Sequence, residues 1–154
     1  MRPVSEVFTS STFREGKGGA GIVIRAGGGA VRVIRRAVRA ESRAHAAYRA
    51  LLYGLSRAHS TGVRQIRVFS DYAEIVAQIA GSADVPPELT GLYLQTRALM
   101  NAYRWSTIEY LPRERNAEAA IAAVEALDEE PLADELDLDG TDPMPLFTSS
   151  TSIS

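Results

Sequence analysis

β-branched, aromatic and other apolar residues are concentrated in short runs along the opening third of the chain, and such runs between glycine-rich segments are typical of β-strands. Three such runs lie at residues 4–9, 20–25 and 30–38, and in the third Val31 and Val33 share one face with Arg35. Two glycine-rich segments, 14–19 and 26–29, separate the runs and are predicted to be turns, because glycine adopts positive φ without steric cost. We therefore predict a three-stranded antiparallel meander.

The apolar period lengthens to three or four residues beyond this meander, as on one face of a helix. The pattern predicts helices at 41–59, 73–80 and 88–103, strands at 65–70 and 107–110, and a last helix from Asn116 to Leu127. Asn116 is expected to cap this last helix, whose buried side would consist of Ala120, Ile121, Val124 and Leu127. The order predicts an α/β fold with a five-stranded mixed sheet, three antiparallel strands followed by two parallel ones, flanked by helices.

Length and composition restrict the class of protein. The chain has 154 residues, which suits one domain, and it has no cysteine, which excludes disulfides and thiolate metal sites. No apolar run approaches the roughly 18 residues of a membrane span, and the first residues lack a signal-peptide core. We expect a cytoplasmic protein with no membrane partner. The composition makes no prediction of the oligomeric state.

Charge is distributed unevenly along the chain. Residues 1–60 contain eleven Arg and Lys against three acidic residues, whereas residues 117–154 contain ten acidic residues and no basic one. Residues 129–154 are acidic and interrupted by proline, so we expect a disordered tail after a domain at 1–128. This tail is predicted either to cover the basic half or to bind a protein partner through its apolar residues Leu136, Leu138, Met144, Leu146 and Phe147.

Asp71 ends the predicted strand at 65–70 and comes just before a helix. Open α/β sheets place their ligands at this point, outside the carboxyl ends of the strands. Two interpretations remain open from the sequence. Asp71 is either a ligand for one weakly held metal ion, or a carboxylate that accepts a backbone N–H at the start of the next helix.

Five motifs in order resemble the ribonuclease H type 1 family. They are Phe8-Thr9-Ser10-Ser11-Thr12, Gly18-Gly19-Ala20-Gly21, the helical stretch from Ala46 to Leu55, Ser70-Asp71, and Leu111-Pro112-Arg113-Glu114-Arg115-Asn116-Ala117-Glu118-Ala119-Ala120. The resemblance covers about residues 4–127. It implies a ribonuclease H-like fold, and an activity that cleaves the RNA strand of an RNA–DNA hybrid with two divalent metal ions held by four carboxylates.

The four carboxylate positions of the family fall at Ser10, Ala47, Asp71 and Ala120, so three of the four carboxylates are missing. Mg²⁺ prefers anionic oxygen ligands, and two-metal catalysis needs a pair of ions held together. Glu74 is the one nearby acidic residue that suits a substitute ligand. We therefore predict a pseudoenzyme without catalytic residues and without a metal cofactor, Mg²⁺ being required only if residual nuclease activity exists.

Basic side chains of the opening half are the candidate contacts to nucleic-acid phosphates. The predicted set is Arg14, Lys17, Arg32, Arg35, Arg36, Arg39, Ser42 and Arg43, with Ser42 keeping a hydroxyl where the family holds phosphate. The sequence thus predicts a catalytically inactive domain that binds an RNA–DNA hybrid or other nucleic acid, or that serves as a protein-interaction scaffold. The alternative is a ribonuclease H-type endonuclease that works through a degenerate metal site.

Overall fold

The computed structural model describes residues 4–129, which form five strands and four α-helices. The strands are β1 (Ser5–Arg14), β2 (Lys17–Arg25), β3 (Val31–Arg39), β4 (Gln65–Ser70) and β5 (Trp105–Tyr110). The helices are α1 (Arg43–Ser60), α2 (Ala73–Ala80), α3 (Thr90–Asn101) and α4 (Ala117–Leu127), with short 3₁₀ turns η1 (Pro87–Leu89) and η2 (Arg113–Arg115). The predicted elements are all present, and β4 and α2 have the predicted bounds.

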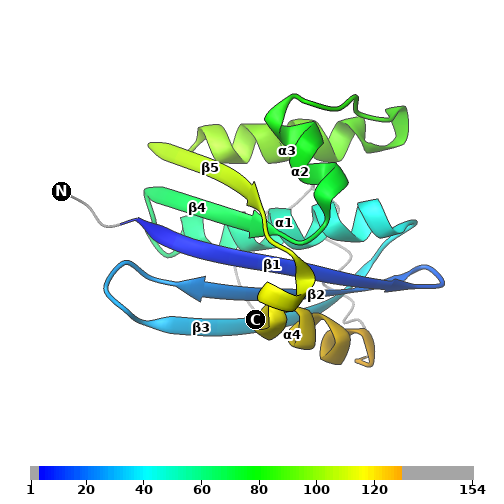
Figure 1. The fold of residues 1–154 in the computed structure, drawn as a ribbon, viewed down its shortest axis with the longest axis horizontal. Coiled ribbons are helices and arrows are strands. Elements are labelled where there is room, and N and C mark those ends of the chain that lie inside the picture. Colours follow the sequence, from blue (N-terminus) through cyan, green and yellow to red (C-terminus); the bar gives the residue numbers. More distant parts are fainter. Residues whose placement is uncertain (1–3, 130–154) are drawn as a thin grey trace.

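One mixed sheet forms the centre of the molecule, with the strand order β3-β2-β1-β4-β5. β1 and β3 both pair with β2 in antiparallel fashion, while β4 pairs in parallel with β1 and with β5 (Figure 1). This arrangement confirms the predicted fold class. It also brings the carboxyl ends of β1, β4 and β5 toward one side of the sheet, because these three strands run in the same direction.

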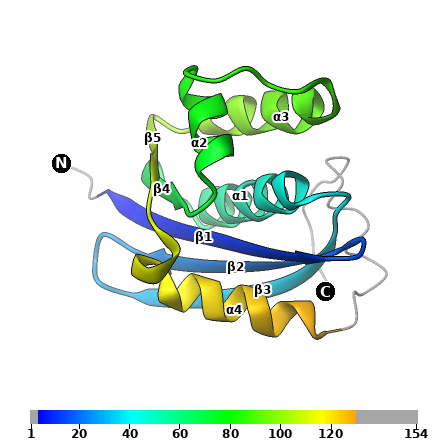
Figure 2. The ribbon, with the colours of Figure 1, turned by 45° about the vertical axis from the view of Figure 1, so that its right-hand side comes forward.

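Helices cover the two faces of the sheet unequally. Among the helices of residues 4–129, α1, α2 and α3 lie on one face and α4 lies on the other (Figure 2). The apolar stripe of α1 supplies Tyr48, Leu51 and Leu55, each fully buried, against Val7 and Ile22 of the sheet. Burial of each large apolar side chain contributes roughly 1.5–3 kcal/mol. The core therefore lies between α1 and the sheet, and it holds the strands that carry the candidate site.

The first hairpin turn is tighter than the sequence predicted. Only Glu15 and Gly16 form it, with φ of 50° and 81°, and β2 begins already at Lys17. Gly18 and Gly19 were expected in the turn, but they belong to the strand. The positive φ that a turn requires is therefore supplied by Gly16 together with one non-glycine residue.

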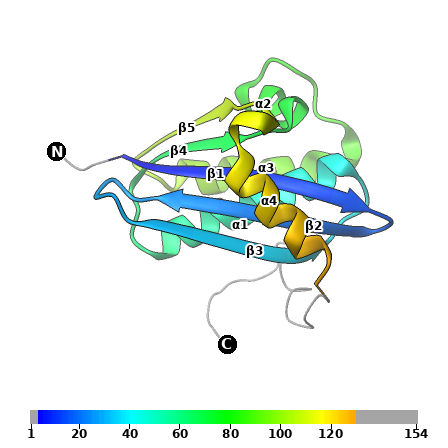
Figure 3. The same cartoon turned by 60° about the horizontal axis from the view of Figure 1, so that its bottom comes forward.

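Glycines of β2 instead let α4 approach the sheet closely (Figure 3). A Cβ on Gly21 would lie 1.9 Å from the carbonyl oxygen of Ala119, and one on Gly19 would lie 2.1 Å from that of Ala123. The helix turns its alanines toward these glycines, so Ile121 and Val124 are 58% and 50% exposed. The prediction that these two residues belong to the buried side of the last helix is wrong, whereas Ala120 and Leu127 are buried as expected.

The acidic tail predicted at 129–154 lies outside the described residues except for Glu129, so its predicted disorder and the domain boundary at residue 128 stay predictions. Within residues 4–129, no helix combines the length and the apolar character that a membrane crossing requires.

Candidate functional site

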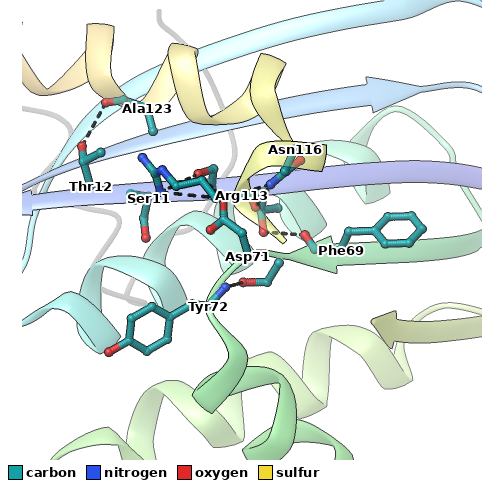
Figure 4. A network of polar contacts seen from close by, with 11 residues as sticks. Ser11, Thr12, Phe69, Asp71, Tyr72, Arg113, Asn116 and Ala123 are labelled. Atoms are coloured by element: carbon teal, nitrogen blue, oxygen red, sulfur yellow. Dashed lines mark hydrogen bonds and ion pairs between the residues drawn. The ribbon is translucent and has the colours of Figure 1, made fainter. Parts of the chain in front are cut away.

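Asp71 follows the carboxyl end of β4, and its side chain is only 4% exposed. The Ser10 hydroxyl donates a hydrogen bond of 2.6 Å to Asp71 Oδ2, and Asn116 Nδ2 donates one of 3.2 Å to the same oxygen. The Arg113 guanidinium lies 3.7 Å from it through Nη1. Figure 4 shows Arg113 and Asn116 converging on Asp71. One carboxylate oxygen thus receives two hydrogen bonds and an ion pair, all from the chain itself.

The sheet register and the segment before α4 bring these partners together. Thr9 of β1 lies opposite Ser70 of β4, so the next residues, Ser10 and Asp71, are neighbours. Arg113 donates from Nη1 to the Ser10 hydroxyl at 3.3 Å and to the Ser11 carbonyl at 3.1 Å. Asn116 also donates from Nδ2 to the Thr9 carbonyl at 2.9 Å. The η2 segment is therefore fastened to β1 and to Asp71 at once.

Helix capping was one interpretation of Asp71 and the prediction for Asn116, but neither side chain makes a capping hydrogen bond. The residue at the N-cap of α2 is Tyr72, whose backbone N–H donates to the Ser70 hydroxyl at 3.1 Å, while the Asp71 carboxylate is engaged by the partners described above. Asn116 does occupy the N-cap position of α4, but its side chain makes no capping hydrogen bond. The capping interpretation of Asp71 is wrong, because its carboxylate is engaged by the Arg113 guanidinium and the Ser10 hydroxyl. Capping by the Asn116 side chain is also wrong, because its Nδ2 donates a hydrogen bond to the Thr9 carbonyl instead.

The two remaining family positions carry methyl groups. Ala47 on α1 is 2% exposed and Ala120 on α4 is 8% exposed. Glu74, the one acidic residue that suited a substitute ligand, is exposed in the first turn of α2. The neighbourhood of Asp71 is consequently built with one carboxylate, one hydroxyl, one amide and one guanidinium.

Two divalent metal ions, which the ribonuclease H resemblance implies, do not fit this set of side chains. Mg²⁺ requires several hard, anionic oxygens at about 2.0–2.1 Å. Here the one carboxylate already accepts hydrogen bonds on Oδ2 and faces the positive Arg113. Across the described part of the chain, no group of three or more His, Cys, Asp or Glu side chains is placed to hold a metal ion.

Sequence reasoning assigned no role to Arg113 and only a helix-capping role to Asn116, although both belong to the motif that runs from Leu111 to Ala120. The available signal was a polar pair three residues apart in a segment that follows a strand end. In the structure η2 separates them, with Arg113 at its start and Asn116 directly after it. Their spacing therefore lets both side chains reach the same end of β1.

Three of the predicted nucleic-acid contacts form a row across one end of the sheet. Arg14 of β1 pairs in register with Lys17 of β2, and Lys17 pairs with Arg39 of β3. Lys17 and Arg39 also line an open groove of about 780 Å³. Its charged lining residues are Glu15, Lys17, Arg39, Glu41, Arg49 and Glu88, and His45 lines it as well. The groove is therefore mixed in charge rather than uniformly basic.

The other predicted contacts lie elsewhere. Arg35 faces α4, where Nη1 and Nε each lie 2.9 Å from a carboxylate oxygen, of Glu125 and Glu129 respectively. Arg36 projects from the opposite face, as the alternation in β3 requires, and its guanidinium lies over the Tyr53 ring of α1. Arg32 shares that face and is exposed. The Ser42 side chain caps α1 by accepting a hydrogen bond from the His45 N–H, and the next residue, Arg43, is the exposed first residue of that helix. The set is thus divided between the two faces of the sheet.

A model of the reverse transcriptase-like family matches residues 7–126, which is most of the chain. The chain belongs to this family. Among curated proteins, the bifunctional protein Rv2228c of Mycobacterium tuberculosis (strain ATCC 25618 / H37Rv) is 37% identical over 84 residues. An uncharacterized protein of Mycobacterium bovis, Mb2253c, matches to the same extent. Each match covers 54% of this chain and 23% of the relative, so the chain spans about a quarter of the length of these relatives.

Solved structures of ribonuclease H domains share the fold of this family member. The N-terminal RNase H domain of Rv2228c, solved as a fusion with maltose-binding protein, has a TM-score of 0.75 at 30% identity, covering 82% of this chain and 94% of that chain. RNase H1 from the archaeon Halobacterium salinarum NRC-1 has a TM-score of 0.76 at 24% identity, covering 81% and 98%. The ribonuclease H resemblance seen in the sequence is therefore confirmed at the level of family and fold.

Proposed function

We propose that this chain is a ribonuclease H-like domain that binds nucleic acid without cleaving it and that needs no metal cofactor. The observation that carries the proposal is the internal neutralisation of Asp71 by Arg113, with Ser10 and Asn116 as hydrogen-bond donors. Two divalent ions would bring four positive charges to a site that holds one carboxylate and already contains a guanidinium. Coulomb repulsion and the lack of anionic ligands both oppose their binding.

An RNA–DNA hybrid is the first ligand to test. The row of Arg14, Lys17 and Arg39 places cations in adjacent strands, where a phosphate backbone can meet several of them. LC11-RNase H1, whose structure in complex with an RNA/DNA hybrid has a TM-score of 0.73 at 22% identity to this chain, shares the fold. The fold, together with these cations, favours binding through the sheet end. A cytoplasmic location remains a prediction from the sequence.

A cleavage assay separates this proposal from the degenerate nuclease. The full chain is incubated with a labelled RNA–DNA hybrid in Mg²⁺ or Mn²⁺, beside the Asp71→Asn variant. We expect an intact hybrid in every reaction. Cleavage by the natural chain that disappears in Asp71→Asn would overturn the pseudoenzyme and establish a nuclease that works through the degenerate site.

Binding is tested by its dependence on salt. We expect the affinity of the full chain for the hybrid to fall as salt rises and to persist in EDTA. Lys17→Ala or Arg39→Ala should each reduce the slope of log K against log salt by about one, which corresponds to one phosphate contact. Arg104→Ala is the matched control, because Arg104 is exposed beside β5 at the opposite end of the sheet. Absence of binding to hybrid, duplex and single strands at low salt would contradict the proposal.

A protein-interaction scaffold is the second candidate, favoured by the two exposed apolar side chains on α4. Ile121 and Val124, one helical turn apart, are 58% and 50% exposed. Exposed apolar residues that lie together are characteristic of interaction sites. The double variant Ile121→Ser and Val124→Ser should keep its thermal stability and lose any partner that co-purifies from the source cell. Retention of the same partners by the variant would exclude this surface.

A further inference from the structure

β3 presents an open edge next to α4. In the described part of the chain, β3 pairs only with β2, which leaves its other side without a neighbouring strand (Figure 3). Its first half alternates exposed apolar and basic residues, with Val31 47% and Val33 53% exposed on either side of an exposed Arg32. An edge strand of this kind is a template for another extended segment.

Ion pairs at the end of α4 bring the acidic part of the chain to this strand. Arg35 of β3 contacts Glu125 and Glu129, both at 2.9 Å, and Arg14 lies 3.6 Å from Asp128. Each of these exposed pairs contributes little to stability, about 0–1 kcal/mol. Their value here is positional, because they fix Glu129, the last described residue, beside β3.

The sequence that follows complements the edge in charge and in pattern. Residues 130–142 contain six acidic residues and no basic one. Within them, Leu136 and Leu138 flank Asp137, just as Val31 and Val33 flank Arg32. In an extended pairing of these two triplets, parallel or antiparallel, Asp137 lies opposite Arg32 and each leucine lies opposite a valine.

The distance is short enough for the chain to span. Leu136 is seven residues after Glu129 in the sequence, which is up to about 23 Å of extended chain. Arg35, the partner of Glu129, is four residues from Val31 along β3, roughly 13 Å. We propose that residues 134–139 dock in cis along the open edge of β3, and thereby compete with nucleic acid for the basic residues of this strand. The competition, though not the docking, rests on the proposed function.

Amide hydrogen exchange tests the docking without nucleic acid. The natural full-length chain is compared with the full-length double variant Leu136→Ser and Leu138→Ser. We expect the β3 amides that do not pair with β2 to exchange about tenfold faster in the variant, which corresponds to about 1.4 kcal/mol, while α1 and β4 stay unchanged. The matched control is Leu132→Ser with Leu146→Ser, which makes the same chemical change outside the triplet and should leave β3 protected.

The outcomes that overturn the docking are distinct. Equal exchange of β3 in the natural chain and in the double variant contradicts it. Protection that grows with protein concentration, together with a dimeric mass by light scattering, assigns the edge to the segment of a second copy and contradicts docking in cis. Asp137→Asn should accelerate exchange beside Arg32, whereas Asp142→Asn, an identical change in charge, should not.

A second arm measures affinity for the RNA–DNA hybrid at low salt. Release of the docked segment should tighten binding by about tenfold in the Leu136→Ser and Leu138→Ser variant. Equal affinities would refute the competition. If β3 is protected by the leucines but no form binds nucleic acid, the proposed function fails while the docking stands. If the natural chain and the double variant bind the hybrid equally and their β3 amides exchange at the same rate, the docking fails while the proposed function stands.

Discussion

At the scale of single residues, the site around Asp71 depends on one positive charge. The carboxylate is 4% exposed and faces Arg113, which is itself 45% exposed. A carboxylate taken out of water needs a compensating charge or hydrogen bonds. Arg113 therefore offsets this buried charge within the chain.

Removal of this guanidinium should destabilise the fold. We expect Arg113→Ala to lower the free energy of unfolding by about 1–3 kcal/mol, because it leaves Asp71 with hydrogen bonds but without a countercharge. In the Asp71→Asn background the same substitution should cost much less, and urea denaturation of the four proteins measures this coupling. Arg115→Ala, an exposed neighbour in η2, should change stability by less than about 0.5 kcal/mol. Strictly additive effects of the Arg113 and Asp71 substitutions would contradict the pairing.

Buried tyrosines make the fold sensitive to alkali. Burial raises the pKa of Tyr48 from 10.0 to about 12, and Tyr93 nearby adds to the shift. The neutral phenol is therefore favoured by folding, so its contribution is complete below pH 10 and is lost as pH rises through about 12. Tyr48→Phe should lose about 1–3 kcal/mol at neutral pH, with the 2.7 Å hydrogen bond to Gln78, but decline less between pH 10 and 12.

Denaturation midpoints at pH 8 and near pH 12 measure this difference. Tyr110→Phe is the control, since Tyr110 is 49% exposed at the end of β5 and should leave the alkaline decline unchanged. A decline in Tyr48→Phe as steep as in the natural chain would assign the alkaline sensitivity to other groups, with Tyr103 as the next candidate, because burial also raises the pKa of Tyr103.

At the scale of elements, α4 depends on the glycines of β2. A Cβ at Gly21 would lie 1.9 Å from the Ala119 carbonyl oxygen, and backbone cannot give way as a side chain can. Gly21→Ala should therefore lower the free energy of unfolding by about 3 kcal/mol and shift α4 away from the sheet. Gly28→Ala is the control, because a Cβ there meets nothing within 4 Å. A Gly21→Ala variant whose free energy of unfolding lies within about 0.5 kcal/mol of that of the natural chain would contradict this packing.

The same contact explains what the sequence could and could not predict about these elements. The three β-branched and aromatic runs of the meander, with the glycine-rich turns between them, and the helical period of α1 were sufficient for the fold class. Burial on α4 did not follow apolar size: the alanines face the sheet and Ile121 and Val124 face outward. Gly19 and Gly21, on one face of β2, were the signal for such close packing, but Gly19 was interpreted as part of a turn and Gly21 as an ordinary strand residue.

The candidate site was predictable only in part for a related reason. Ser10 and Asp71 were each predicted at the end of a strand, and the family resemblance assigned both to one site. The parallel pairing of β1 with β4 makes them neighbours. Arg113 and Asn116 reach the same point from a segment without periodicity, so their direction depended on η2 and on where α4 rests. The sequence predicted on which face of β3 each Arg side chain lies, but not its ion-pair partner. Glu125 and Glu129 reach Arg35 only because α4 packs on that face of the sheet.

At the scale of the whole molecule, basic and acidic residues are concentrated in different halves of the sequence but lie beside each other in the fold. The basic meander and the acidic end of α4 contact each other through Arg14 and Arg35. This arrangement has a consequence for binding, since any polyanion that approaches β3 must displace carboxylates already present. We therefore expect hybrid binding by the full chain to be weaker than its count of Arg residues suggests, and to be strongly dependent on salt.

Restoration of the missing carboxylates tests whether the four positions still form one site. The triple variant Ser10→Asp, Ala47→Glu and Ala120→Asp restores the three carboxylates that the ribonuclease H resemblance implies beside Asp71. If the four positions form one site, mutual repulsion and loss of hydration should lower the stability of the variant without metal. Mg²⁺ or Mn²⁺ should then raise its melting temperature, because a ligand at one hundred times its Kd stabilises by about 2.7 kcal/mol. The natural chain should show no such rise, since Arg113 already occupies the role of the cation.

The matched control adds the same three acidic residues at exposed positions far from Asp71, as Ser60→Asp, Ala83→Glu and Ala102→Asp. It should respond to metal no more than the natural chain does. An equal rise of the melting temperature in the control would mean that added negative charge alone explains the effect of metal. No rise in the triple variant would mean that α1 and α4 no longer hold their residues close enough to share a metal ion. A rise in the triple variant alone means that the backbone of a two-metal site persists here, and that its side chains, rather than its fold, are what oppose cleavage.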